Sequence, residues 1–218
     1  MRCIKKFVPQ KIRNIYHLFQ AVLACLIYGF PSRKIKVIGI TGTNGKTTTC
    51  QMIAKILEEA GKKVAVISTI NFKLGEKEWV NKTKFTTMSS FAVQKFILDA
   101  VKARCEYLVL ETSSHSLDQY RVWGIDYDAA VITNVTREHL DYHKTMDEYR
   151  AAKLRLFKKA RVIAVNLDME NAKDFLQFNN EKKFTYSLKN KEANVLAEDI
   201  DLGINYSKFK IQNSKFIF

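Results

Sequence analysis

Proline, paired cysteines and acidic residues near the N-terminus are scarce in this sequence. Two prolines in 218 residues, beside an apolar fraction of 47%, argue against a disordered chain. The cysteines form no Cys-x-x-Cys pair and no metal-binding spacing, which favours free thiols in a reducing cytoplasm: Cys3, Cys25, Cys50 and Cys105. There is no internal repeat and no low-complexity linker. The length therefore suits one larger α/β domain with a small appendage.

Acidic residues are absent from the start of the chain, where the first is Glu58. Residues 1–36 contain eight Lys or Arg side chains, and the whole chain has a formal net charge of +14. Elsewhere the lysines are interspersed with acids, as on an ordinary solvated surface. No combination of basic and aromatic residues typical of RNA-binding proteins stands out, so we expect no nucleic-acid partner.

The N-terminal arm, residues 1–34, combines basic charge with an apolar pattern at helical spacing. The apolar positions are Ile15, Leu18, Phe19, Val22, Leu23, Leu26 and Ile27. Three interpretations remain open: a helix packed on the body, a helix lying on an anionic membrane surface, or a short signal segment. The second would bring to lipid phosphates Lys5, Lys6, Lys11 and Arg13.

A bilayer-spanning helix and a secreted product are both disfavoured for this arm. Crossing a membrane takes about 20 mostly apolar residues, and this stretch contains Asn14, His17 and Gln20. No small-residue cleavage site follows the apolar positions, because residues 29–33 lead straight into an apolar run.

That apolar run, residues 36–40, is followed by a glycine-rich loop and a lysine in the segment GTNGKTTT, residues 42–49. A strand, such a loop and a helix start together hold phosphates, since glycines let backbone N–H groups turn inward. The lysine, Lys46, would meet the β- and γ-phosphate oxygens, and the hydroxyl of Thr47 would reach Mg²⁺. Ile40 stands where the usual pattern has its first glycine, so the motif is a shorter variant. We predict a nucleotide triphosphate site.

Strand and helix patterns alternate through the rest of the chain. We predict strands over residues 36–40, 63–69, 107–111, 129–134 and 161–166, with helices over 48–60, 91–103, 146–159 and 170–178. Residues 70–80 read as a hairpin turning at Gly75, and a few short strands follow residue 183. This order predicts an α/β fold with a mostly parallel sheet covered by helices on both faces. Ligands then gather at the carboxyl ends of the strands.

Several polar residues follow those strand ends: Glu111, Asn134, His139 and Asp141. Mg²⁺ that bridges ATP phosphates takes oxygen ligands, which Glu111 and Thr47 could supply. A single acid at a strand end could equally be the partner of a helix N-terminus or of a surface lysine. His115 and His143 stay open between a structural role and the orientation of a ligand.

Four segments now carry a family resemblance: GTNGKTTT (42–49), LETSSHSLDQYR (110–121), TNVTREHLDYH (133–143) and AAKLRL (151–156). From about residue 35 onward the chain resembles the central domain of the Mur ligase family, and most of all its muramoyl-tripeptide synthetase branch. These ligases use ATP to turn a substrate carboxylate into an acyl phosphate, which an amino-acid amine then attacks to form an amide. The resemblance implies a P-loop α/β fold, ATP and Mg²⁺ as cofactors, and a UDP-N-acetylmuramoyl-peptide and an amino acid as substrates.

The resemblance also assigns roles to individual residues. For ATP it implies Gly42, Thr43, Asn44, Gly45, Lys46, Thr47, Thr48 and Asn134. For the metal it implies Thr47, Glu111, His139 and Lys153, the last after carbamylation by CO₂. Lys46, His139 and Lys153 would be catalytic. For the nucleotide-sugar substrate it implies Thr86, Thr87, Ser113, Gln119 and Arg121.

The chain departs from a three-domain ligase of this family. We expect residues 1–34 to form a basic apolar helical arm and residues 35–218 the central ATP-binding domain, with the family's N- and C-terminal domains missing. Three functions stay open: a ligase core completed by a separately encoded C-terminal domain, a nucleotide-binding module that does not ligate, and another acid–amine ligase such as a folylpolyglutamate synthase. We expect a cytoplasmic location, at the inner face of the membrane if the arm binds lipid.

Overall fold

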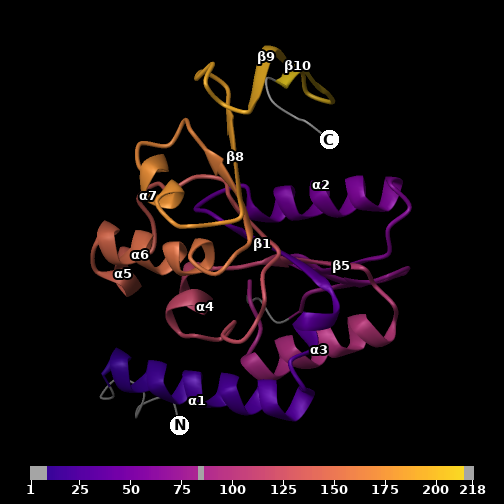
Figure 1. Cartoon of the computed structure of the whole chain (residues 1–218), viewed down its shortest axis with the longest axis vertical. Helices are drawn as coiled ribbons and strands as arrows, with labels where there is room; N and C mark the ends of the chain where they lie inside the picture. Colours follow the sequence, from indigo (N-terminus) through magenta and orange to yellow (C-terminus); the bar gives the residue numbers. More distant parts are fainter. Residues whose placement is uncertain (1–8, 83–85, 214–218) are drawn as a thin grey trace.

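The computed structural model describes residues 9–82 and 86–213, and Figure 1 shows the chain as a twisted sheet with helices on both sides. Cys3, Lys5 and Lys6, considered above, lie outside the described residues.

A single sheet runs through the described residues in the strand order β10-β9-β8-β7-β6-β1-β5-β2-β3-β4. Its strands are β1 (Lys36–Thr41), β2 (Val64–Ile67), β3 (Asn71–Leu74), β4 (Lys77–Val80), β5 (Tyr107–Glu111), β6 (Ala129–Ile132), β7 (Val162–Asn166), β8 (Lys182–Ser187), β9 (Val195–Leu202) and β10 (Ser207–Asn213). The strands from β2 to β9 in this order pair in parallel, while β3, β4 and β10 pair antiparallel at the two edges. The predicted mostly parallel α/β sheet is confirmed.

The helices are α1 (Gln10–Tyr28), α2 (Lys46–Glu59), α3 (Ser90–Lys102), α4 (Ser114–Asp118), α5 (Leu140–His143), α6 (Met146–Phe157) and α7 (Ala172–Leu176), with a 3-10 turn at Pro31–Lys34. The central strands alternate between two cores, as residues on a pleated strand must. In β5, Val109 packs in the core under α2, whereas Leu108 and Leu110 belong to the larger core under α3 and α6. This double coverage explains why the parallel strands read as continuous apolar runs.

The predicted N-terminal helix is present as α1, and it packs against the body. Small buried side chains on one face allow the close approach to α3: Ala21, Ala24 and Cys25. Gly29 ends the helix in the left-handed conformation. Among the helices of residues 9–82 and 86–213, none has the length and apolar character needed to cross a bilayer. The packed-helix interpretation is thus correct for one face of α1.

Candidate active site

The glycine loop joins the carboxyl end of β1 to the start of α2, as the sequence predicts. Gly45 sets the turn because it has a left-handed backbone, φ 79°, and α2 begins at the next residue. Gly42 is needed for another reason: a Cβ there would lie 1.8 Å from the Thr133 hydroxyl. No side chain caps the N-terminus of α2 and no acid lies in its first turn. The positive end of this 14-residue helix is therefore presented toward the loop.

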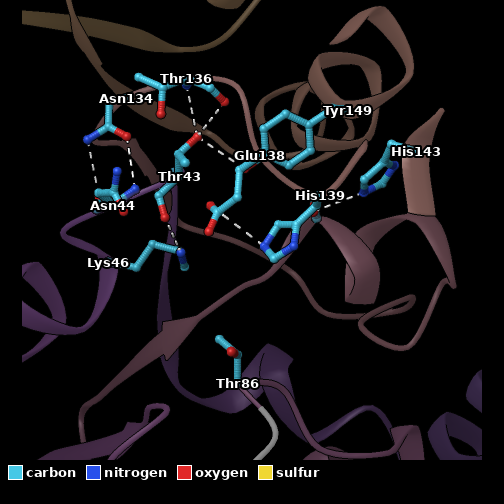
Figure 2. Close-up of polar contacts among 12 residues, drawn as sticks. Thr43, Asn44, Lys46, Thr86, Asn134, Thr136, Glu138, His139, His143 and Tyr149 are labelled. Carbon is cyan, nitrogen blue, oxygen red and sulfur yellow. Dashed lines mark hydrogen bonds and ion pairs between the residues drawn. The ribbon is translucent and has the colours of Figure 1, made fainter. Parts of the chain in front are cut away.

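The loop is attached to the segment that follows β6. The Asn134 side chain accepts a hydrogen bond from the Asn44 N–H at 2.9 Å and donates one to the Asn44 carbonyl at 3.1 Å. Thr133 donates to the same carbonyl at 2.6 Å. Figure 2 shows the paired contacts between the Asn134 and Asn44 groups. Asn134, predicted to contact ATP, here fixes the shape of the phosphate loop.

Thr43 points away from the helix start and into the protein. Its backbone N–H donates to the Asn134 carbonyl at 2.9 Å, and its hydroxyl lies 3.1 Å from the phenol oxygen of Tyr149 and accepts from the Thr136 N–H at 2.9 Å (Figure 2). Its carbonyl accepts from the Lys46 ammonium at 2.7 Å. The side chain of Thr43 therefore holds the loop in place, and Lys46 lies folded over the loop.

Glu111 ends β5 beneath this loop and is buried, with 1% of its surface exposed. Its carboxylate accepts hydrogen bonds from the Thr47 hydroxyl at 2.9 Å, and from the Thr69 N–H and hydroxyl at 2.8 Å each. The strand-end prediction thus brings Glu111 and Thr47 together. Thr69 was missed, although it follows β2 and the strand-end rule that selected Glu111 applies to it equally.

Lys153 reaches the loop from α6. It is 1% exposed, and its ammonium donates to the Gly42 carbonyl at 2.8 Å and lies 4.3 Å from the centre of the Tyr149 ring. Burial lowers the pKa of Lys153 to about 7, and the charge of Lys46 acts in the same direction. Tyr149 was also missed, although it precedes Lys153 by four residues and so shares its helix face.

Of these groups, Gly42, Lys46, Tyr149 and Lys153 line one cavity of about 380 Å³. We call the loop side, with Gly42, Lys46, Thr47, Glu111 and Lys153, the phosphate wall. Across the cavity stand all five residues predicted for the nucleotide-sugar substrate: Thr86, Thr87, Ser113, Gln119 and Arg121. Arg121 is anchored by a 2.6 Å hydrogen bond to the Thr87 carbonyl, and Ser113 by its N–H to the Thr87 hydroxyl. Residues from four separate segments therefore meet in this cavity.

The cavity is also lined by three aromatic side chains, His115, His139 and Tyr149. Their rings lie against those of Tyr142 and His143, and we call these five residues the histidine wall. The His115 ring centre lies 4.9 Å from that of His139 and 5.4 Å from that of His143. His139 has a left-handed backbone, φ 57°, immediately before α5, and its side chain is 40% exposed. It lies 3.7 Å from Glu138 (Figure 2), and no contact to Thr47 or Glu111 is found among the described residues.

The sequence left the roles of His115 and His143 open, and the structure places the two residues in different surroundings. His143 is 3% exposed and bonds Ser114 at 3.0 Å, and burial lowers its pKa to about 4. It is a neutral structural residue at ordinary pH. His115 lines the cavity, and burial followed by the charge of His139 lowers its pKa. Asp141 is exposed on α5.

A metal ion would need ligands beyond protein side chains in this arrangement. Within residues 9–82 and 86–213, no three His, Cys, Asp or Glu side chains are grouped so that they could hold a metal ion. Oxygen atoms of Glu111 and Thr47 lie together, and Mg²⁺ commonly binds through one or two carboxylates plus substrate phosphates. The donor set therefore fits Mg²⁺ bound together with a nucleotide.

Comparison with known proteins agrees with this geometry. Residues 40–217 match the model of the Mur ligase middle domain. UDP-N-acetylmuramoyl-L-alanyl-D-glutamate–2,6-diaminopimelate ligase of Clostridium tetani is 41% identical over 191 residues, which cover 88% of this chain and 39% of that protein. UDP-N-acetylmuramyl-tripeptide synthetase of Roseiflexus sp. is 36% identical over 197 residues, covering 83% of this chain and 38% of that protein.

A solved structure of a UDP-N-acetylmuramoyl-L-alanyl-D-glutamate–2,6-diaminopimelate ligase superimposes with a TM-score of 0.78 at 30% identity, covering 95% of this chain and 43% of the other. The chain thus spans about two fifths of the length of the relatives it matches. With the family model matched over residues 40–217, the chain belongs to the Mur ligase family, of which it contains the middle domain.

Proposed function

We propose that this chain is the ATP-binding core of a ligase that attaches an amino acid to the peptide of a UDP-N-acetylmuramoyl precursor of peptidoglycan. The observation that carries the proposal is the single cavity in which Lys46, Lys153 and the five predicted substrate residues meet. The names of the relatives, which are muramoyl-peptide ligases, favour this branch over a folylpolyglutamate synthase.

ATP would bind with its phosphates at the start of α2. Backbone N–H groups of the first turn, from Lys46 to Thr48, are directed there by the left-handed turn at Gly45. Lys46 would exchange its hydrogen bond with the Thr43 carbonyl for the phosphate oxygens. Gly42, Asn44 and Asn134 would keep the loop shape, which is the contribution we assign to them.

Mg²⁺ would be held by Thr47 and Glu111 together with phosphate oxygens. When bound, it would offset the repulsion between two anions, the γ-phosphate and the substrate carboxylate. His139 would have to turn toward the phosphates to serve as a further ligand, which its exposed position and left-handed backbone leave open.

Lys153 is suited to carbamylation because this reaction needs a neutral amine. At a pKa of about 7, a large fraction of the Lys153 side chain is neutral near neutral pH. The amine nitrogen would form a bond to the carbon of CO₂ and release one proton, which leaves a carboxylate-like anion beside Gly42 and Lys46. The modified side chain would add the second anionic oxygen ligand.

The chain's residues would then position two successive transfers. A carboxylate oxygen of the muramoyl-peptide attacks the γ-phosphorus and ADP leaves; the amino-acid nitrogen next attacks the acyl carbon, loses a proton and expels phosphate. Arg121 can bind a diphosphate or carboxylate of the substrate with a fork of N–H donors. Lys46 would stabilise charge that develops on the transferred phosphoryl group.

The incoming amino acid would be bound by a part of the ligase that lies outside these residues. The chain matches only about two fifths of its relatives' length, so we propose that turnover requires the remaining parts. The reaction would take place in the cytoplasm.

Calorimetric titration tests the phosphate site. We expect the native chain to bind ATP with Mg²⁺ and Lys46→Ala to lose that binding. Lys55→Ala is the matched control, since Lys55 lies exposed on the same helix and is paired with Glu59. Equal binding by the native chain and Lys46→Ala would refute the assignment of the loop.

Phosphate release tests the reaction. The chain would be mixed with UDP-muramoyl-dipeptide and candidate amino acids, with and without the product of an adjacent gene. Release that depends on all substrates supports the ligase, whereas ATP binding without release in every mixture supports a nucleotide-binding module that does not ligate.

A further inference from the structure

The face of α1 that points away from the body carries a continuous stripe of exposed apolar side chains. We call it the apolar stripe: Ile12, Ile15, Tyr16, Phe19, Leu23, Leu26 and Ile27, which are 39–67% exposed. They recur at the three- and four-residue spacing of one helix face. Figure 1 shows α1 at the outer edge of the molecule, beyond α3 and α4 and at the opposite end from β9 and β10.

The other face of α1 is already occupied, so the apolar stripe cannot simply turn inward. Close packing against α3 involves the small residues named above, and a Cβ on Gly124 would lie 2.4 Å from the Cys25 sulfur. Nearer the N-terminus, Gln10 donates to the Tyr142 phenol oxygen at 2.7 Å and Asn14 donates to Asp118 at 3.0 Å. The orientation of the helix about its own axis is therefore fixed.

The charges that α1 itself carries beside the apolar stripe have one sign. Lys11 and Arg13 are exposed on α1 and flank the stripe on its two sides, and the sequence holds no acid before Glu58. Three acids on the body are paired: Asp99 with Lys95, Asp118 with Arg155, and Asp126 with Arg33. The exposed Glu148 lines a hollow together with Lys11 and Ile15 at the N-terminal end of α1. A partner that covers the stripe would therefore meet the two basic side chains of α1, Lys11 and Arg13.

An anionic lipid surface satisfies both requirements. A helix that lies in the interface buries its apolar face among acyl chains while basic side chains reach the lipid phosphates. At about 1.5 Å per residue, the 19 residues of α1 give a contact line of about 28 Å. A protein partner would also need an acidic rim that follows this line, whereas an anionic bilayer offers negative charge wherever the helix settles.

We propose that α1 lies along the surface of an anionic lipid bilayer through the apolar stripe and holds the domain there without crossing the membrane. The inference does not depend on the proposed ligase function, because no residue of the stripe lines the cavity.

Vesicle flotation tests this proposal with the whole chain and no nucleotide. Vesicles of phosphatidylglycerol and phosphatidylcholine in equal parts should carry the native chain upward, and pure phosphatidylcholine should carry far less. Phe19→Asp should lower the partition coefficient at least about tenfold, since it places a charge at the centre of the buried face. Replacing both Lys11 and Arg13 by Gln should lower it by about fivefold for each charge removed.

Met52→Asp is the matched control, because Met52 is 61% exposed on α2 and Phe19 is 64% exposed on α1. It should float like the native chain, and circular dichroism should show that both variants are folded. Failure of the native chain to float with anionic vesicles overturns the proposal, as does equal flotation of Phe19→Asp. Sedimentation velocity tests the alternative that the stripe binds a second copy of the chain. If the native chain binds no lipid but forms a concentration-dependent dimer that Phe19→Asp abolishes, the stripe is a dimer contact and the proposal is overturned.

Discussion

The phosphate wall and the histidine wall of the cavity differ in how their side chains are held. Glu111 and Lys153 are almost fully buried and bonded to groups from other segments: Glu111 to Thr47 and Thr69, Lys153 to Gly42. His139 is 40% exposed and lies immediately before the four-residue helix α5, which is bounded by His139 and Lys144, both with positive φ. Glu111 and Lys153 are therefore preorganised by their bonds to other segments, while His139, which was also predicted to bind the metal, depends on the local backbone of one short loop.

The largest expected effect concerns the chemistry of Lys153. With isotopically labelled bicarbonate, the native chain should show the carbon resonance of a lysine carbamate, because burial leaves the amine largely neutral near pH 7. Lys153→Met should abolish that resonance, as measured by nuclear magnetic resonance. Lys46→Met, which removes the other lysine of the same wall, should retain it. If the native chain gives no carbamate signal, the metal-ligand role of Lys153 fails.

A second consequence of this burial is a pH-dependent stability. The Lys153 pKa is about 7 in the folded chain and 10.5 in the unfolded reference, so between these values only the unfolded state binds the proton. Below that window both states are protonated and the folded state carries the full cost of a buried charge; above it both are neutral. Stability must therefore rise with pH through the window.

Urea unfolding in CO₂-free buffer measures this effect against Lys153→Met, which has no titrating group at this position. From pH 7 to 9 the native chain should gain up to about 3 kcal/mol relative to the variant. A constant difference between the two proteins over that range would mean that Lys153 is not buried as described.

A third prediction tests whether the Glu111 charge serves the metal or only the fold. Glu111→Gln keeps a side-chain oxygen that can accept from Thr69 but removes the negative charge. We expect affinity for ATP in the presence of Mg²⁺ to fall at least about tenfold, or about 1.4 kcal/mol, while binding in excess chelator stays the same. Calorimetry with Glu106→Gln, at the opposite end of the same strand region and paired with Lys62, gives the control. An equal loss with and without Mg²⁺ would point to a structural role.

The contrast between the walls also explains how far sequence reasoning could go. The strand predicted at residues 107–111 is β5, with Glu111 at its end, because a buried parallel strand is a continuous apolar run whose end can be located in the sequence. The end of the apolar run over residues 36–40 likewise located the glycine loop and the helix α2 that follow it. The parallel addition of β8 and β9 to the main sheet could not be predicted, because short alternating strands do not identify their neighbours.

The histidine wall was beyond prediction for a different reason. The left-handed backbone of His139 and the contacts of Tyr149 depend on segments far apart in the chain, such as Thr43 with Tyr149. The residue types alone left His115 and His143 undecided, since an imidazole becomes structural or accessible only through its burial. Of this wall, the family resemblance assigned a role to His139 alone, and it could not supply the surroundings of that residue.

The smallest expected effect concerns strain at the end of the histidine wall. Lys144 has φ 60° and ψ −45°, and the Thr145 N–H donates to the His143 carbonyl at 2.6 Å, which makes Lys144 the centre of a γ-turn of the strained kind. Lys144→Gly should relieve that strain and stabilise the chain by about 1 kcal/mol in urea unfolding, after the entropy that glycine adds to the unfolded state. Lys144→Ala removes the same side chain without relieving the backbone, so it should give no gain. Equal stability of the two variants would show that this wall is no more strained than the phosphate wall, and the difference between them would then lie in exposure alone.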